Sequence, residues 1–380
     1  MKTGDDINIR DFELERYFAR YEFAVKYIMS ASDCESLPMN ELLRMADPET
    51  LDLWKNLKLG YTESQGHPLL RKEISRLYDS IKTEEILTLA PEEGIFIAMN
   101  CVLKRGDHAV VTFPAYQSLY ELANSLGCKI TRWSSSLENG WELDLNFLEN
   151  SIRKETRIII VNFPQNPMGY MPSRKKFMDI VKIARDHDLF LFSDEMYRML
   201  EYGSERLPPA CDVHEKAISL SGLSKAFSLP GLRMGWLATK DGSLFKKIAS
   251  FKDYTTICGS APTEILAIMA LRAKNEILSR NLEIIKRNIG LTEEFFSRHG
   301  ELFSWVKPNG GSVAFPLLKS KTGVDKFCED VLKKENMMIL PGSVFDFPGN
   351  HFRIGLGREN FPACLKILEK YVKSSKLKRI

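Results

Sequence analysis

Short apolar runs rich in β-branched residues alternate with segments of helical periodicity between about residue 86 and residue 240. The clearest run is RIIIVNF at 157–163, which is continuously apolar, as in a strand covered on both faces of a sheet. In residues 92–104, apolar side chains recur at spacings of three and four residues, which predicts an amphipathic helix. Strands that alternate with helices are typical of a parallel sheet lying between helices, and we expect that α/β architecture here.

The same patterns predict the other elements of this region. Further strands are expected at 108–113, 128–133, 189–195, 217–221 and 234–238, and further helices at 116–126 and around 177–184. After about residue 260 the pattern changes to long, charged amphipathic helices, such as one over 262–300. Two short strand candidates follow, SVAFPLL at 312–318 and HFRIGLG at 351–357.

These patterns divide the chain into two predicted domains. We expect a large domain over residues 46–260 and a smaller α+β domain built from residues 1–45 and 261–380. Residues 1–45 are helical in pattern, and the pattern alone is compatible with packing on either domain.

Composition excludes several classes of protein. The 380 residues include 53 basic and 50 acidic side chains, so no global charge favours nucleic acid or an anionic membrane. Seven cysteines without a C-x-x-C pair indicate free thiols in a reducing compartment, and we expect no metal site. The first residues lack the apolar stretch of a signal peptide, and no run has the length of a membrane span. We therefore expect a soluble, cytoplasmic protein.

Polar side chains follow the predicted parallel strands at the points where those strands end. Asn166 lies in a loop between two prolines after the 157–163 strand, and Asp194 and Tyr197 end the next strand. Lys225 and Arg233 stand in the connection between the last two strands of the region. Because ligands of open parallel sheets lie beyond the carboxyl ends of the strands, we expect these five side chains to converge on one rim.

Each of these residues also has a purely structural interpretation. Asn166 is a common turn residue, and Asp194 would serve as a helix cap or as the partner of an arginine. Of Asp194 and the adjacent Glu195, Glu195 suits this structural role better. Lys225 would lie on an exposed loop, whereas Arg233, which opens the apolar run MGWLA, would need an anionic partner if it is buried. The joint placement of the five favours a ligand site.

Three motifs carry a resemblance to a known family. NFPQNPMG, SDEMY and SLSGLSKAFSLPGLRMGW resemble the motifs of the class I and II aminotransferases, the fold-type I enzymes that use pyridoxal 5′-phosphate. The resemblance extends from LGYTESQGHPLLRKEI near residue 59 to HFRIGLG near residue 357. It implies a mainly parallel seven-stranded sheet between helices, with a smaller α+β domain. It also implies transfer of an amino group between an L-amino acid and a 2-oxo acid.

The resemblance implies roles for the residues at the rim. Lys225 matches the lysine that forms a Schiff base with the cofactor and then moves the proton, and Arg233 matches the arginine on its phosphate. Asp194 matches the carboxylate that faces the pyridine nitrogen. Asn166 and Tyr197 match the groups that hydrogen-bond the ring oxygen.

Three more matches lie outside these motifs. Tyr116 matches the aromatic residue that stacks on the ring. Tyr61 matches a tyrosine that reaches the phosphate of the neighbouring subunit, which implies a homodimer with shared sites. Arg353 matches the arginine that, together with Asn166, binds the α-carboxylate of the substrate.

Two positions depart from the family pattern. Where the family has glycine and a small residue at the start of the phosphate-binding helix, this chain has Ala90, Pro91 and Glu92. Pro91 removes one N–H donor and the Glu92 carboxylate would repel a phosphate, so we expect the helix end to bind the phosphate without assigning its donors. Gly222 replaces a frequent hydroxyl residue, for which Ser221 or Ser224 would substitute.

Two other functions are compatible with this family. The stretches KAFSLPGLRMGW, FKDYTTICGSAP and GGSVAFPLL are also similar to capreomycidine synthase, which implies elimination and ring closure in place of transamination. A transcription regulator with the same fold would carry an added DNA-binding domain. The roughly 45 residues before the first motif are too few for such a domain and lack a basic recognition pattern.

Overall fold

A seven-stranded sheet forms the centre of the chain in the computed structural model, which describes residues 9–374 and 377. Its strand order is β2-β8-β7-β6-β5-β3-β4. The strands are β2 (Ile86–Leu89), β3 (His108–Phe113), β4 (Lys129–Ser134), β5 (Thr156–Asn162), β6 (Phe190–Asp194), β7 (Ala217–Gly222) and β8 (Gly235–Ala238). Only β8 runs antiparallel to its neighbours, β2 and β7. The predicted mainly parallel seven-stranded sheet is confirmed.

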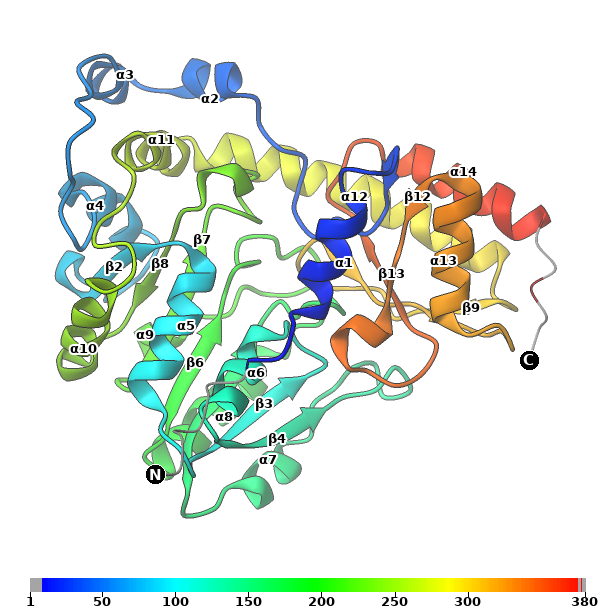
Figure 1. Cartoon of the computed structure of the whole chain (residues 1–380), viewed down its shortest axis with the longest axis horizontal. Helices are drawn as coiled ribbons and strands as arrows, with labels where there is room; N and C mark the ends of the chain where they lie inside the picture. The colour runs from blue at the N-terminus through cyan, green and yellow to red at the C-terminus, as the bar shows by residue number, and fades with distance from the viewer. Residues whose placement is uncertain (1–8, 375–376, 378–380) are drawn as a thin grey trace, which may run out of the picture.

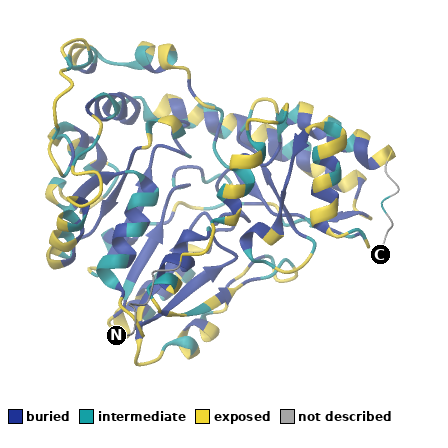
Figure 2. Cartoon of the chain, viewed as in Figure 1, coloured by how far each residue is buried: buried dark blue, intermediate teal, exposed yellow. Residues whose placement is uncertain are grey.

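Helices cover both faces of this sheet (Figure 1). Those of the large domain are α4 (Pro68–Ser75), α5 (Pro91–Val102), α6 (Ser118–Ser125), α7 (Leu145–Ser151), α8 (Arg174–Asp186), α9 (Ala210–Val213) and α10 (Gly242–Lys252), with the short 3-10 turns η1 (Thr83–Glu85) and η2 (Pro230–Leu232). Successive side chains of a strand point to opposite faces. Ile158 and Ile160 of β5 therefore share a core with α5, whereas Ile159 and Val161 share a second core with α8. The continuous apolar run reflects this burial on both faces, which Figure 2 shows for the sheet as a whole.

The C-terminal part is a smaller α+β unit. Its helices are α12 (Lys274–Arg298), α13 (Val324–Glu335) and α14 (Phe361–Ser374), and its strands are β9 (Phe303–Ser304), β10 (Val313–Ala314), β11 (Leu317–Leu318), β12 (Met337–Met338), β13 (Leu340–Pro341) and β14 (Phe352–Gly355), with the 3-10 turn η3 (Gly342–Phe345). Strands β10, β14 and β13 form one small sheet. Both predicted strand segments of this region are present, in shorter form.

The helix predicted over 262–300 is two helices. α11 (Ala261–Arg272) is separated from α12 by the single residue Ala273. No glycine or proline marks this break in the sequence. α11 is buried along most of its length and packs against α4 and two N-terminal helices, α2 (Met39–Met45) and α3 (Pro48–Lys55). The predicted domain boundaries stay a prediction.

The N-terminal segment is less helical than predicted. Helix α1 (Glu13–Tyr21) forms, but residues 22–38 contain only the short strand β1 (Tyr27–Ile28), which pairs in parallel with β12. Residues 1–8 of this predicted helical segment lie outside the described residues. The hydrogen bonds that β1 finds in the C-terminal unit are long-range, so a local helical pattern does not reveal them.

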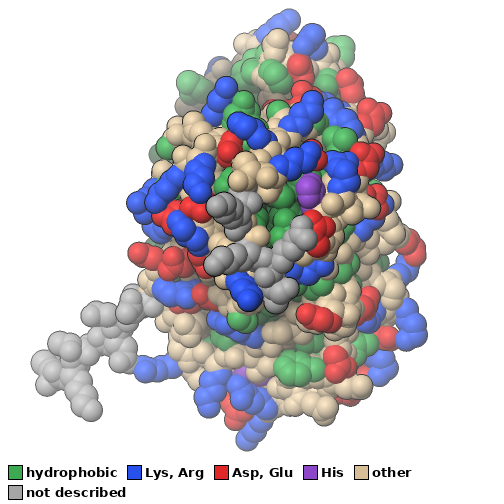
Figure 3. Space-filling view, turned by 90° about the vertical axis from the view of Figure 1, so that its right-hand side faces the viewer, with side chains coloured by type: hydrophobic (Ala, Val, Ile, Leu, Met, Phe, Trp, Pro, Cys, Tyr) green, Lys and Arg blue, Asp and Glu red, His purple; other side chains and the backbone are tan. Residues whose placement is uncertain are grey.

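The charged side chains at the surface reflect the balanced composition. On the face shown in Figure 3, lysine and arginine side chains are interspersed with aspartate and glutamate. Within residues 9–374, no helix is long and apolar enough to cross a membrane. The described residues also contain no group of three His, Cys, Asp or Glu side chains arranged to hold a metal ion. All seven cysteines are free thiols, as predicted.

Candidate active site

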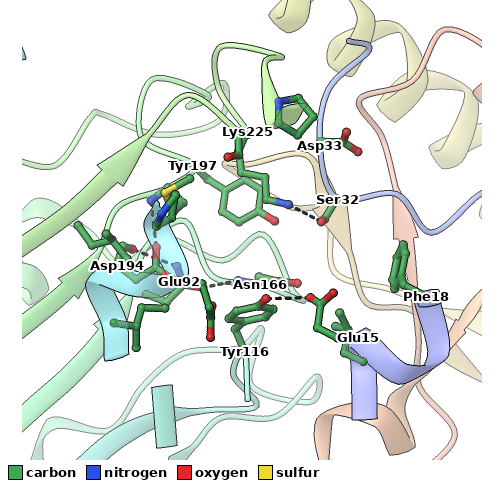
Figure 4. A pocket seen from close by; sticks show the side chains of 18 of the residues that line it. Glu15, Phe18, Ser32, Asp33, Glu92, Tyr116, Asn166, Asp194, Tyr197 and Lys225 are labelled. Atoms are coloured by element: carbon green, nitrogen blue, oxygen red, sulfur yellow. Dashed lines mark hydrogen bonds between the residues drawn. The ribbon is translucent and has the colours of Figure 1, made fainter. Parts of the chain in front are cut away.

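A cavity of about 470 Å³ lies at the carboxyl ends of the central strands (Figure 4). All the predicted site residues except Tyr61 line it. These residues are Pro91, Glu92, Tyr116, Asn166, Asp194, Tyr197, Ser224, Lys225, Arg233 and Arg353. The large domain, the C-terminal unit and helix α1 all contribute side chains, so the cavity exists only in the folded chain.

Lys225 lies in the loop that follows β7, and its amine is held by a residue that sequence reasoning did not single out. Its Nζ donates a hydrogen bond of 2.7 Å to Oγ of Ser32, and it lies 6.0 Å from the centre of the Tyr197 ring. The segment that carries Ser32 is tied in turn to the C-terminal unit, because Ser312 Oγ donates to the Ser32 carbonyl at 2.6 Å. The amine therefore has a fixed direction inside the cavity.

Asp194 is a buried carboxylate at the end of β6. Its side chain accepts a hydrogen bond of 3.1 Å from the Met196 N–H and has no ion pair among the described residues. Burial raises the pKa of Asp194 to about 7. A buried acid of this kind is stabilised by a cationic N–H donor in the cavity.

Arg353 is a buried guanidinium that forms no ion pair with the described residues. Only 1% of it is exposed, and it donates to Asn166 Oδ1 at 3.0 Å and to the Ser30 carbonyl at 2.9 Å. Its Nε has no partner among the residues described, and burial lowers the pKa of the guanidinium. The aromatic rings of Phe18 and Phe345 lie 5.8 Å and 5.4 Å from it. Such a group fits the binding of a carboxylate.

Two buried hydroxyl groups of the cavity also lack partners within the described part of the chain. They are Tyr197 Oη and Ser224 Oγ. A buried polar atom without a hydrogen bond indicates a ligand or water that satisfies it. Together with the Lys225 amine, the lone acid Asp194 and the lone cation Arg353, these atoms fit a cofactor with a pyridine ring and a bound amino acid.

Arg233 is exposed, so the condition for an anionic protein partner does not arise. The apolar run that follows it becomes a strand only from Gly235. The backbone of Arg233 is left-handed, with a φ of 53°, and its Nη1 donates to the Pro230 carbonyl at 2.9 Å. Solvent removes the need for a carboxylate partner, so the guanidinium lines the cavity and is available to an anionic ligand.

The start of α5 forms another wall of the cavity. Pro91 is its first residue, and Glu92 lines the cavity beside it. Ser118 Oγ donates to Glu92 Oε2 at 3.3 Å, and burial raises the pKa of Glu92 to about 7. At neutral pH this carboxyl is therefore protonated in about half of the molecules, which weakens its repulsion of an anion.

Gly222 has a steric role. A β-carbon at this position would lie 2.9 Å from Cα of Gly235 and 3.2 Å from Cγ of Pro91. Of the two proposed substitutes for the missing hydroxyl, Ser224 lines the cavity and Ser221 does not.

Glu195 has the structural role expected for it. Its Oε1 accepts hydrogen bonds from the Ala210 N–H at 2.9 Å and from Ser219 Oγ at 2.7 Å. These contacts attach the end of β6 to α9 and β7, and they leave Asp194 as the acid that faces the cavity.

Sequence reasoning missed the wall formed by helix α1, although the segment around Ser30 to Ser36 was a candidate for lining the pocket. Glu15, Phe18 and Glu22 line the cavity from α1 and its C-terminal end, and Ser32 and Asp33 line it from the following segment. The first three recur at helical spacing, which was the available signal, but nothing in the sequence says what a helix face packs against. Tyr116, in the connection between β3 and α6, is linked to this wall because its hydroxyl donates to Glu15 at 2.8 Å.

Tyr61 does not join the cavity of its own chain. It is 92% exposed, beside Leu59, which is 86% exposed. Its exposure is compatible with the predicted contact to a second subunit, which stays a prediction.

Comparisons with known proteins agree on the family. The family profile described as Aminotransferase class I and II matches residues 48–360. Capreomycidine synthase of Streptomyces vinaceus is 27% identical over 350 residues, which cover 91% of this chain and 88% of that protein. A crystal structure of a PLP-dependent aminotransferase from Streptococcus suis has a TM-score of 0.91 at 28% identity, covering 96% of this chain and 98% of the other. That of the PLP-dependent cyclase OrfR has a TM-score of 0.89 at 25% identity, covering 98% and 99%. The chain belongs to the class I and II aminotransferases, a family of transferases that use pyridoxal 5′-phosphate.

Proposed function

We propose that this enzyme transfers an amino group between an L-amino acid and a 2-oxo acid, with pyridoxal 5′-phosphate bound through Lys225. One observation carries the proposal. The Lys225 amine, the buried acid Asp194 and the buried guanidinium of Arg353 all line one cavity, and neither Asp194 nor Arg353 forms an ion pair with the described residues. The cofactor and the substrate carboxylate would supply the missing charges.

The cofactor supplies an electron sink that makes the Cα–H bond of an attached amino acid acidic. Asp194 would pair with the ring nitrogen and keep it protonated, which is consistent with its burial without an ion-pair partner among the described residues. Asn166 and Tyr197 would hydrogen-bond the ring oxygen, and Tyr116 would pack against the ring face. Arg233, Ser224 and the start of α5 would hold the phosphate.

Two residues position the reacting proton. Arg353, with Asn166 bound to it at 3.0 Å, holds the α-carboxylate and so sets the direction of the Cα–H bond. The Lys225 amine would be the group that accepts and donates the Cα proton. The Ser32 hydroxyl, 2.7 Å from Nζ, keeps the amine directed into the cavity.

Elimination with ring closure is the second candidate. It is favoured by the 27% identity to capreomycidine synthase over 91% of the chain and by the likeness to a PLP-dependent cyclase. The residues described above would serve both reactions, because both begin with removal of the Cα proton. The two differ in one requirement, since elimination needs no 2-oxo acid acceptor.

A homodimer in the cytoplasm completes the proposal. Leu59, Tyr61, Tyr254 and Ile257 are apolar or aromatic side chains with exposed fractions of 86%, 92%, 90% and 52%. The segments around residues 59–61 and 256–262 border one shallow depression. An exposed apolar patch of this kind favours a second copy of the chain, to whose cavity Tyr61 would then extend. The free cysteines fit a reducing compartment.

The test uses the absorbance of the cofactor in the purified holoenzyme. Amino acids alone are expected to convert the cofactor to its aminated form, and a 2-oxo acid is expected to restore it. Repeated turnover to products without an oxo acid would instead support elimination, because transamination without an acceptor stops after one equivalent of product. Borohydride reduction followed by peptide mapping is expected to find the pyridoxyl group on Lys225, and Lys225→Ala to abolish both signals. An adduct at another lysine would overturn the proposal.

A further inference from the structure

Helix α1 presents an acidic face to the cavity. Glu15, Phe18 and Glu22 follow one another at intervals of three and four residues, so their side chains lie on the same side of the helix. All three are half-buried. In Figure 4, Glu15 and Phe18 lie across the cavity from Asp194 and Glu92. Helix α1 therefore lies on the side of the cavity opposite Asp194, the residue proposed to face the cofactor ring.

The cations that line the cavity all have a use under the proposed function. They are Lys225, Arg233 and Arg353, which would hold the cofactor carbon, the phosphate and the α-carboxylate. Among the described lining residues, no further cation remains for a second carboxylate on the substrate. An acidic substrate side chain would instead meet Glu15 and Glu22.

The carboxylates on this side are only partly compensated. Arg358 pairs with Asp33 at 2.8 Å, and the Tyr116 hydroxyl donates to Glu15 at 2.8 Å. Glu22 has no side-chain hydrogen bond or ion pair to the described residues. Burial and the nearby carboxylates of Asp33 and Glu15 raise the pKa of Glu22. The cations Arg358 and Lys225 offset this rise only in part. A ligand cation would relieve this repulsion.

Two unpartnered atoms of the same cavity, already described, indicate that a ligand occupies this space. Tyr197 Oη is buried in the same cavity without a partner, and so is Nε of Arg353. Phe18 lies between the two glutamates in the sequence of α1 and 5.8 Å from the Arg353 guanidinium. An apolar stem that starts at an α-carboxylate on Arg353 would therefore pack on Phe18 before it reaches a carboxylate of α1.

We propose that the substrate is an amino acid whose side chain ends in a cation, either an ammonium or a guanidinium group, paired by Glu15 and Glu22. The inference rests on the proposed function, because it takes Arg353 as the site of the α-carboxylate. Phe18 contacts the aliphatic stem of the side chain and stacks with the charge.

The test compares amino acids of the same shape and different charge. L-arginine is paired with L-citrulline, and L-lysine with L-norleucine, and each is titrated into the holoenzyme by calorimetry and by cofactor absorbance. The charged member of at least one pair is expected to bind more tightly by about tenfold to a hundredfold, the usual effect of a charged hydrogen bond. L-aspartate is expected to bind more weakly than either cation.

Variants of α1 locate the effect. Glu15→Gln and Glu22→Gln are each expected to reduce the ratio of the two affinities, charged over uncharged amino acid. The double variant is expected to bring this ratio close to one. Glu13→Gln is the matched control, because Glu13 is exposed on the same helix and does not line the cavity. It is expected to keep the full preference, and circular dichroism verifies that all variants fold.

The possible failures separate the two claims. Equal binding within both pairs, with cofactor conversion intact, overturns the cationic substrate and leaves the proposed function standing. The same holds if the preference survives the double variant, or if aspartate binds most tightly. A strong charge preference in calorimetry without any spectral conversion overturns the proposed function and supports the charge recognition. Failure of every amino acid to bind overturns both.

Discussion

A β-carbon at Gly222 would lie 3.2 Å from Cγ of Pro91, so the two departures from the family pattern form one contact. A β-carbon at Gly235 would lie 2.8 Å from the same Cγ of Pro91. Helix α5 therefore begins directly on the backbones of β7 and β8, with no side chain between them. The proline ring occupies space that a hydroxyl residue at position 222 would need, while Ser224 supplies a hydroxyl to the cavity from the next turn of the chain.

Gly222→Ala is expected to lower the free energy of unfolding by about 1–3 kcal/mol, the usual cost of overpacking a tight site. The reason is steric, because two of the close contacts are backbone atoms of Met234 and Gly235, both at 2.9 Å. Urea unfolding measures the effect. Gly290→Ala, inside α12 with no atom within 4 Å of the new carbon, should change stability in the opposite direction, by about 0.5–1 kcal/mol. Equal behaviour of the two variants would contradict the steric argument.

Ser32→Ala removes the hydrogen bond that orients the Lys225 amine. The chemical step is expected to slow by about twofold to tenfold, the value of one such bond, with little change in cofactor content. Single-turnover absorbance changes measure the step. Ser36→Ala is the control, since Ser36 is exposed and does not line the cavity. An unchanged rate in Ser32→Ala would remove this residue from the positioning of Lys225.

Asp194 makes the stability of the cofactor-free enzyme depend on pH. Its pKa is raised from 3.8 to about 7 by burial, so the folded state binds the proton more tightly than the unfolded state. The stabilisation that comes from keeping this carboxyl protonated in the folded state is complete below about pH 4 and is lost as the pH rises to about 7. Asp194→Asn is expected to stabilise the apoenzyme at pH 8 by on the order of 2–4 kcal/mol and to have little effect at pH 4. Thermal unfolding at the two pH values measures this. A stabilisation of equal size at both would contradict the raised pKa.

Glu92 is expected to weaken phosphate binding as it ionises. Burial raises its pKa to about 7, so the carboxyl is mostly neutral at pH 6 and mostly charged at pH 8. Glu92→Gln is expected to bind the cofactor about tenfold more tightly than the wild-type enzyme at pH 8, and equally at pH 6. Equilibrium dialysis of the cofactor gives the two constants. The titration of the free cofactor is common to both measurements, so the ratio of the two constants reports the effect of Glu92, and a ratio independent of pH would refute its titration.

Leu59→Glu tests the proposed homodimer. A charge in the exposed patch around Leu59 and Tyr61 is expected to produce monomers, and the cofactor is expected to bind more weakly because Tyr61 would no longer reach the partner's cavity. Analytical ultracentrifugation measures the mass. Phe147→Glu serves as the comparison, since Phe147 is 43% exposed on α7, away from the patch. A wild-type protein that sediments as a monomer would contradict the proposal.

The central sheet was predictable because its signals are local. The strand at 157–163 is apolar throughout since both faces are covered, and the helix at 92–104 shows its buried face as a period of three and four residues. Positions where strands end also follow from this pattern. Asp194 and Asn166 could therefore be placed at one edge of the sheet before any coordinates were known.

The sequence by itself determined the alternating sheet and helices, the polar residues at the strand ends and, through its motifs, the family. Only the tertiary structure decided what closes the cavity. Lys225 meets Ser32 across 193 positions, and Arg353 meets Asn166 across 187. Helix α1 shows its periodicity locally, yet the surface it packs against comes from distant segments. Contacts of this kind depend on how whole elements pack, because hydrophobic burial is not directional and leaves no residue-by-residue signal of the partner.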